Sequence, residues 1–227
     1  MMLSGEIAAR ITDVVDVADL VTMLHMSADW LARDEEELTS LDQAIGDGDH
    51  GRNMRIGFRA VLEELDSIQV RDPDLGTLLS YVGLTLISAV GGASGPLYGA
   101  GFTAAGMVLS GRRRAGLPEL TVALEAACQG IARRGHCYPG DKTILDTLQP
   151  AADALKTALA GGSPLGAALD QMREAARQGM ASTIPLQARR GLAMRFGPRS
   201  IGHQDPGATS CYLLLDALVT AWMQRHT

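Results

Sequence analysis

The sequence predicts an all-α fold, and three observations support this prediction. First, apolar residues recur at steps of three and four, as in Leu75, Leu78, Leu79 and Val82, where a strand would alternate. Second, aromatic residues make up only 4% of the chain, and alternating runs rich in valine, isoleucine and threonine are missing. Third, the breaks between apolar segments are short, so successive helices are expected to pack as antiparallel neighbours.

Turn-forming residues mark the ends of the first helices. Glycines at positions 46, 48 and 51 end the second apolar segment, and "RDPD" at 71–74 separates the third from the fourth. Gly91 and Gly92 end the fourth segment. Pro96 then suits the first turn of the fifth, because its missing N–H has no partner at a helix start.

The later helices are separated in the same way. The breaks are "GRRRAGLP" at 111–118, "HCYPGDKT" at 136–143 and "GGSP" at 161–164, and Asp205 before Pro206 is placed to cap the last helix. The nine predicted helices cover residues 6–32, 34–46, 53–66, 75–90, 96–110, 119–135, 143–160, 164–181 and 206–225.

The composition describes one globular domain spanning residues 1–227, long enough to bury a core and a pocket. The net charge of −6 argues against a nucleic-acid partner, because phosphate backbones are bound by basic surfaces.

Neither a secretion signal nor a membrane segment is expected. Charged residues interrupt the N-terminal apolar positions, and the apolar stretch near the C-terminus is shorter than the roughly 20 residues of a membrane span. Three cysteines without a CxxC pair suit a cytoplasmic protein.

The segment "LDQAIGDGDHGRN" at 41–53 gathers three aspartates and three glycines. The glycines indicate that the helix ends there, so the backbone can bring the carboxylates of Asp42, Asp47 and Asp49 together. Converging anions require a cation, and hard oxygen ligands select Mg²⁺ or Ca²⁺. An EF-hand does not fit, since Phe58 stands where the closing glutamate would be, and Mg²⁺ is therefore favoured. The alternative is that these aspartates only cap the next helix or face solvent.

Two further loops have the composition of binding loops. Residues 91–95, Gly-Gly-Ala-Ser-Gly, precede a helix N-terminus and together with it form a candidate anion site, with close helix packing as the alternative. In "IGHQDPGATS" at 201–210, Asp205 is the expected helix cap, and His203 stays open as a ligand, a base or a polar loop residue.

Taken together, these loops resemble one family, the nucleotide-binding L subunit, or L domain, of dihydroxyacetone kinases. The resemblance covers nearly the whole chain and rests on five blocks that occur in order at compatible separations. The blocks are "LDQAIGDGDHGRNMRIGF" (41–58), "GGASGPLYG" (91–99), "PGDKTILD" (139–146), "STIPLQARRG" (182–191) and "RSIGHQDPGATS" (199–210).

This resemblance implies a closed antiparallel barrel of about eight helices, with ADP or ATP bound at one end through two Mg²⁺ ions. Because nine segments were predicted, one of them is expected to be split or to lie outside the barrel. By motif, the implied metal ligands are Asp42, Asp47 and Asp49. The implied nucleotide-binding residues are His50 and Asn53 at the phosphates, Gly92, Ala93 and Ser94 also at the phosphates, Gly140 and Ile144 at the adenine, and Asp205 at the sugar.

The resemblance also implies a phosphotransferase that works as half of an enzyme, with dihydroxyacetone held on a separate K subunit. The Gly-His-Gln-Asp-Pro-Gly form of the last loop favours ADP as a bound cofactor that a phosphotransferase-system protein rephosphorylates. ATP consumption, on dihydroxyacetone or another short ketose, is the alternative. Whether the chain forms a homodimer stays open.

One departure from the family pattern concerns charge. The family usually has Gly-Arg-Ala-Ser-Tyr before the last motif, and Leu192 occupies the arginine's position. That arginine is expected near the phosphates, where it would stabilise charge, and Arg195 is the candidate replacement. Without a replacement, the chain serves a different K subunit and ketose, or it binds nucleotide as a non-catalytic regulatory partner.

Overall fold

The computed structural model describes residues 13–69 and 72–226, and within them the chain is almost entirely helical. These residues form nine α-helices, one 3-10 helix and two strands of two residues each. In chain order the elements are β1 (Val15–Asp16), α2 (Val17–Arg33), α3 (Glu35–Ile45), α4 (His50–Gln69), α5 (Leu75–Ala89), α6 (Ser94–Val108), β2 (Arg114–Ala115), α7 (Leu117–Gly135), α8 (Leu145–Ala160), α9 (Leu165–Ser182), η1 (Leu192–Ser200) and α10 (Pro206–His226).

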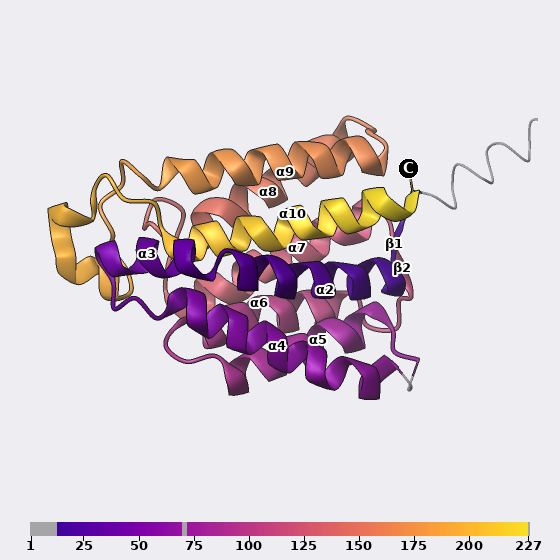
Figure 1. Cartoon of the computed structure of the whole chain (residues 1–227). Coiled ribbons are helices and arrows are strands. Elements are labelled where there is room, and N and C mark those ends of the chain that lie inside the picture. The colour runs from indigo at the N-terminus through magenta and orange to yellow at the C-terminus, as the bar shows by residue number, and fades with distance from the viewer. Residues whose placement is uncertain (1–12, 70–71, 227) are drawn as a thin grey trace, which may run out of the picture.

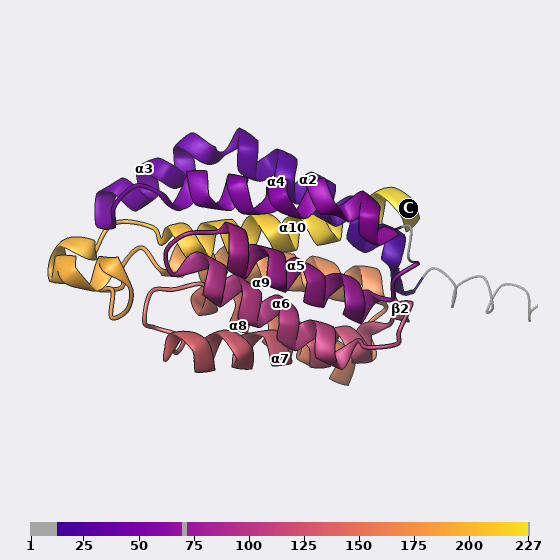
Figure 2. The same cartoon turned by 90° about the horizontal axis from the view of Figure 1, so that it is seen from below.

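The helices pack against their neighbours in sequence, as predicted. Each helix from α4 to α10 contacts the next one along the chain, and α2 contacts both α10 and α4. Figures 1 and 2 show these helices side by side along a common direction, alternating in sense. As a consequence, α4, α6, α8 and α10 all begin at the same end of the molecule, where α3 and η1 also lie.

The start of α2 is set by a reciprocal cap that the prediction missed. The Asp16 carboxylate accepts the Asp19 N–H at 2.9 Å, while the Asp19 carboxylate accepts the Asp16 N–H at 2.8 Å. This capping box satisfies N–H groups that have no partner inside the helix. The predicted helix 6–32 was therefore wrong over residues 13–16, and residues 6–12 lie outside the described part of the chain.

A short antiparallel sheet, which the composition did not predict, joins two distant segments. Val15 pairs with Ala115, and Asp16 pairs with Arg114. With two residues in each strand, this pairing is too short for the alternation by which a strand is recognised in a sequence. It ties the chain before α2 to the connection between α6 and α7.

The end of the molecule near the strands is closed by the last turns of α10. Trp222 Nε1 donates to the Val14 carbonyl at 2.8 Å, and its ring stacks on His226 with 5.0 Å between centroids. Arg225 donates to Asp16 at 2.7 Å and also to Asp19, a fully buried residue. This lock joins the first and last described segments at the end opposite to η1 (Figure 1).

Apolar side chains from the helices meet in one continuous core, with Leu24, Phe58, Leu86 and Leu165 among its fully buried members. Burial of this surface supplies most of the driving force that holds the helices in place. Among the residues that the structure describes, no helix combines the length and the apolar character needed to cross a membrane.

Candidate functional site

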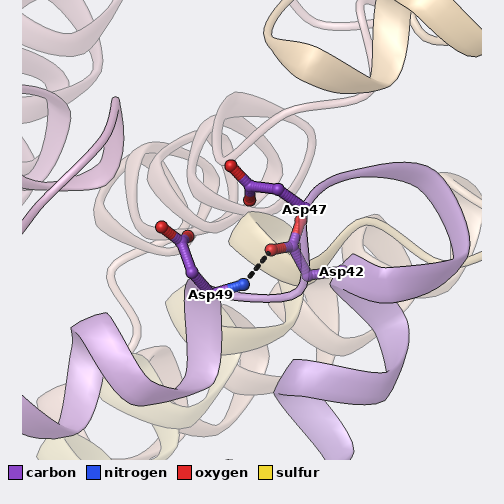
Figure 3. Close-up of side chains that lie close together, drawn as sticks. All are labelled: Asp42, Asp47 and Asp49. Carbon is purple, nitrogen blue, oxygen red and sulfur yellow. Dashed lines mark hydrogen bonds between the residues drawn. The ribbon is translucent and has the colours of Figure 1, made fainter.

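The connection between α3 and α4 brings the three predicted aspartates together. Helix α3 ends at Ile45, and α4 begins at His50, so Asp47 and Asp49 lie in the short turn while Asp42 lies in the last turn of α3. One carboxylate oxygen from each aspartate lies within 4.8 Å of the others (Figure 3). The predicted convergence is therefore present in the fold.

Local backbone contacts explain why the turn adopts this shape. The Asp42 Oδ2 atom accepts the Asp49 N–H at 2.9 Å and the His50 N–H at 3.1 Å, as Figure 3 shows for the first of these bonds. A side chain at Gly46 would place its Cβ 2.1 Å from the Asp42 carboxylate, so only glycine fits there. Asp42 thus holds the start of α4 in addition to facing the other two carboxylates.

The electrostatics of the aspartate cluster favour a cation. Burial raises the pKa of Asp42, and the charges of Asp47 and Asp49 raise it further, although the two backbone N–H donors oppose this. Within residues 13–69 and 72–226, none of the ion pairs involves these three aspartates. Three close carboxylates without a cationic side chain form a donor set that fits a hard divalent ion.

Four helix N-termini surround a cleft next to these aspartates. They belong to α4, α6, α8 and α10, which begin at this end because neighbouring helices alternate in sense. The first turn of a helix offers unpaired N–H groups and a partial positive charge, and both favour anions. The cleft has a volume of about 430 Å³. An anionic ligand therefore meets carboxylates on one side and helix N-termini on the others.

Most of the residues implied by the motifs line this cleft. They are Asp42, Asp47, Asp49, His50, Gly92, Ala93, Ser94, Ile144 and Asp205. Asn53 and Gly140 are not part of the lining. Asn53 lies one turn inside α4, beside Gly91, and Gly140 lies in the loop before α8, where its N–H donates to Asp146 at 2.5 Å.

The glycine turn before α6 presents its backbone to the cleft. Gly92 has a φ of +65°, a conformation that favours glycine, and no atom lies within 4 Å of where its side chain would begin. Ala93 follows as the N-cap residue, and α6 begins at Ser94. This is the open, amide-rich concavity that an anion site requires.

A buried histidine connects three of the four helix starts. His50 Nδ1 lies 3.1 Å from Ser94 Oγ, and its Nε2 lies 2.9 Å from Ser210 Oγ, which is 2.7 Å from the Tyr98 hydroxyl. Burial lowers the pKa of His50 to about 4, so the imidazole is neutral near pH 7. A neutral ring with both nitrogens engaged positions the first turns of α4, α6 and α10 relative to one another.

Asp205 caps α10, as predicted. Its Oδ2 atom accepts the Ala208 N–H at 2.7 Å, and its own N–H donates to Thr183 Oγ1 at 3.0 Å. Burial raises its pKa to about 7, against the opposing effects of the Ala208 bond and the nearby Lys142 charge. The Ala208 N–H therefore orients the carboxyl at the cleft, and the Thr183 hydroxyl holds the backbone of Asp205 in place.

Two carboxylates shape the loop between α7 and α8, and sequence reasoning assigned them no role. Asp146 accepts the Thr143 N–H at 2.7 Å and the Gly140 N–H, while Asp141 accepts the Tyr138 N–H at 3.0 Å. Aspartate readily accepts such local N–H bonds, so the dense Asp and Gly content of this loop was the available signal. The loop carries Lys142, Thr143 and Ile144 into the cleft wall.

The structure shows which cationic residues border the cleft near the unusual leucine. Leu192 begins η1, is 39% exposed and lines the cleft, but Arg195 is not part of the lining, so the expected replacement is not supported. Arg190 and Arg134 line the cleft instead, and Arg190 Nε lies 3.3 Å from Asp141 Oδ2. Sequence reasoning missed Arg190, because its place at the cleft depends on the distant loop that contains Asp141.

Comparisons with known proteins agree on one family. The DAK2 domain matches residues 44–220 of this chain. The ADP-binding subunit DhaL of the PEP-dependent dihydroxyacetone kinase of Escherichia coli (strain K12) is 41% identical over 89% of this chain and 95% of its own length. The DhaL subunit of PEP-dependent dihydroxyacetone kinase 2 of Listeria innocua is 37% identical over 91% of this chain and 95% of its own length.

A solved structure shows the same fold. It is the dihydroxyacetone kinase of C. freundii in complex with AMP-PNP and Mg²⁺, which superposes with a TM-score of 0.67 at 27% identity. The match covers 91% of this chain and 34% of that chain, so this chain spans about a third of the solved kinase.

Proposed function

The chain belongs to the DAK2 domain family, and from this we propose that it is the nucleotide-binding L subunit of a dihydroxyacetone kinase. In this role it transfers the terminal phosphoryl group of a bound nucleotide to dihydroxyacetone held on a separate K subunit. The family membership confirms the resemblance drawn from the five sequence blocks. The kinase-subunit names of the relatives likewise agree with the predicted phosphotransferase activity.

The observation that carries this proposal is the aspartate cluster beside four helix N-termini. Carboxylate oxygens of Asp42, Asp47 and Asp49 within 4.8 Å of one another form a fitting donor set for Mg²⁺. When bound, Mg²⁺ neutralises charge on the phosphoryl group being transferred. We assign these three residues as the ligands, and two ions as the number that they hold.

The remaining cleft residues are proposed to hold the nucleotide. The amides of Gly92 and Ala93 and the first turn of α6 bind phosphate oxygens, since they combine open N–H donors with the positive end of a helix. His50 and Asn53 support this turn from α4. Gly140 and Ile144 border the adenine, and Asp205 accepts a hydroxyl of the sugar while it caps α10.

Orientation and charge are what the chain contributes to the reaction. Phosphoryl transfer depends mainly on in-line positioning and on stabilising negative charge, with little covalent chemistry for the protein to perform. Neutral His50 keeps three helix starts in register, and Arg190 offers a guanidinium at the cleft wall. A protein with a net charge of −6 can therefore bind a polyanion.

The phosphoryl donor is proposed to be a phosphotransferase-system protein, with ADP retained as a cofactor. The support is that the E. coli and L. innocua relatives are named PEP-dependent, ADP-binding subunits, and that they match this chain over nearly their full length. All three cysteines are unpaired and buried, which fits the predicted cytoplasmic location.

We also propose that the chain is one domain built as a closed barrel of eight helices. The contacts of α2 with α10 and α4, added to those between successive helices from α4 to α10, are consistent with a closed ring. In this arrangement α3 is the additional ninth helix. It lies outside the ring and delivers Asp42 to the end where the cleft is.

A coupled assay with a K subunit and dihydroxyacetone tests the function. Product is expected when a phosphotransferase-system donor and PEP are supplied, and ADP is expected to remain bound to freshly purified protein in native mass spectrometry. Product formed with ATP alone would overturn the donor assignment. Absence of product with every donor, for dihydroxyacetone and for other short ketoses, would overturn the kinase assignment.

A second candidate function is that of a nucleotide-dependent regulatory partner. It is favoured by Leu192, which puts an apolar, partly exposed side chain at the cleft where the family usually has arginine. This function predicts tight Mg-ADP binding without phosphoryl transfer. The same assay, combined with calorimetry, separates the two.

A further inference from the structure

Lys142 is a buried cation at the wall of the cleft whose donors are all used inside the protein. It is one of two lysines in the chain, the other being Lys156, and it is only 1% exposed. Its ammonium donates to the carbonyls of Thr183 at 2.8 Å, Leu186 at 3.2 Å and His203. Three acceptors match the three N–H bonds of an ammonium group.

These acceptors lie at both ends of the excursion between α9 and α10, which consists of residues 183–205 and carries η1. In Figures 1 and 2 the excursion projects beyond the ends of the helices. Apart from Lys142, its two arms are joined at the base by the Gly202 N–H, which donates to the Ile184 carbonyl at 2.8 Å, and by the Asp205 N–H, which donates to Thr183 Oγ1 at 3.0 Å. The ammonium thus fastens the entry and the exit of the excursion to the loop that precedes α8.

The excursion supplies a wall of the cleft but none of the aspartate cluster. It contributes residues 190–193 and Asp205 to the lining, while Asp42, Asp47 and Asp49 come from the connection between α3 and α4. Displacing the excursion would therefore move the wall that faces the ligand without moving the carboxylates.

We propose that Lys142 is a positioning residue of the nucleotide site, which sets the place of the excursion 183–205 against the cleft. This inference rests on the proposed function, since it assigns a role within the same site. The residue touches three carbonyls and acts through the backbone that they belong to. Its effect is expected on ligands that reach the excursion, and not on ligands that contact only the metal and the glycine turn.

The burial of the group supports a specific role over a passive one. A buried ammonium loses its hydration, and burial lowers the pKa of Lys142 despite the nearby carboxylates of Asp205 and Asp146. Even with all of its donors satisfied, a buried charge carries a desolvation cost, so its place here calls for a specific role. A guanidinium is planar and larger, so arginine cannot present three donors to the same three carbonyls.

Substitution of Lys142 with a comparison of two ligands tests the proposal. Calorimetry should show that Lys142→Met weakens Mg-ADP binding by at least about tenfold, since the displaced wall loses contacts with ADP and one lost hydrogen bond between wall and ligand already corresponds to such a factor. Binding of Mg-pyrophosphate should change by less than about twofold. The matched control is Lys156→Met, at an exposed ion pair with Glu125, which should change neither affinity.

Equal loss of ADP and pyrophosphate affinity in Lys142→Met would overturn the proposal, and so would unchanged affinity for both. The proposed nucleotide site fails separately, because in that case the unsubstituted protein itself binds no Mg-ADP, and the kinase assignment is tested separately by the coupled assay. Lys142→Arg is a further check, since it keeps the charge and should still lose ADP affinity.

A measurement on the unsubstituted protein covers the case in which Lys142→Met does not fold. Reductive methylation with ¹³C-formaldehyde and a borane reductant gives NMR signals for the two lysines and the α-amino group. Lys156→Met identifies the Lys156 signal, and the α-amino signal is recognised by its titration near about pH 8. Lys142 should react much more slowly than Lys156, and Mg-ADP should slow it at least about tenfold further by holding the excursion closed. A Lys142 rate that equals that of Lys156, or that ADP leaves unchanged, would overturn the proposal.

Discussion

The carboxylate of Asp42 accepts the backbone N–H of Asp49 at 2.9 Å, so one predicted metal ligand holds another in place. Asp47, in contrast, is exposed, and its carboxylate takes part in none of the hydrogen bonds or ion pairs found among the described residues. Asp42 and Asp47 therefore differ in what they contribute to the fold, although the carboxylates of both belong to the same cluster.

This difference predicts separable effects of two substitutions. Asp47→Ala should weaken Mg-ADP binding by at least roughly 100-fold, because even outer-shell partners of a metal are worth 10- to 100-fold, and it should leave the unfolding free energy unchanged. Asp42→Ala should weaken binding as strongly and also lower the unfolding free energy by roughly 1–3 kcal/mol, since two N–H groups lose a charged acceptor. Calorimetry with and without EDTA, and urea unfolding, provide the two measurements. Unchanged ADP affinity in Asp47→Ala would reject the metal-bridged site.

Charge at the excursion gives a second prediction. Arg190 lines the cleft with a side chain that is 43% exposed. Arg190→Ala should therefore slow phosphoryl transfer by about tenfold, which is less than the roughly 10²- to 10³-fold loss of rate when a buried hydrogen-bond donor is removed from an active site. Leu192→Arg should raise the rate, because it restores a cation at the cleft. The matched control is Arg195→Ala, outside the cleft, for which the rate in the coupled assay should not change. A rate that falls in Arg195→Ala and not in Arg190→Ala would reverse the assignment.

The buried cap of α10 gives a pH dependence with a definite sign. Burial raises the pKa of Asp205 from 3.8 to about 7, so the folded state holds a proton that the unfolded state releases. Its stabilising contribution is full below pH 3.8 and is lost as the pH rises through about 7. Asp205→Asn removes this titration. The unfolding free energy of the variant minus that of the unsubstituted protein should therefore rise with pH. Urea unfolding in EDTA between about pH 5 and pH 8 measures this, and a constant difference would contradict it.

The lock at the far end predicts a stability effect without a binding effect. Arg225→Met should lower the unfolding free energy by roughly 2–4 kcal/mol, because the fully buried Asp19 loses its guanidinium partner, while ADP affinity stays unchanged. The exposed pair of Arg177 and Glu174 provides the control, since Arg177→Met should leave the unfolding free energy nearly unchanged.

The substitution Arg225→Met should also alter unfolding in acid. Burial raises the pKa of Asp16, but its bonds from Arg225 and the Asp19 N–H outweigh this and lower it from 3.8 to about 2. The stability that Asp16 contributes is therefore present above pH 3.8 and lost as the pH falls through about 2. Arg225→Met should flatten the loss of stability in this window, and an unchanged acid profile would contradict the assignment.

Most of the helical fold could be predicted from the sequence, because apolar periodicity and Gly or Pro boundaries act locally. The helix predicted over 75–90 is α5 at Leu75–Ala89, and the one predicted over 206–225 is α10 at Pro206–His226. The 3-10 helix η1 was not predicted, since Gly197 and Pro198 interrupt its pattern and its place depends on distant segments. Contacts between segments far apart in the sequence, such as that of β1 with β2, produce no local periodicity from which they could be predicted.

The candidate site could be predicted in part for the same reason. The aspartate cluster lies within eight residues, and its glycines show that the chain turns, so its convergence was visible in the sequence. The burial of Lys142 was not, because it depends on carbonyls 41 to 61 residues away. The position of Arg190 depends likewise on the loop that contains Asp141.

The lock formed by Trp222 and Arg225 places the last turn of α10 at the end of the molecule remote from the aspartates (Figure 1). A fluorophore or surface tether joined after this turn would thus leave the opening of the cleft clear for a docking protein. Immobilised in this way, the subunit should keep its full exchange with partners in solution.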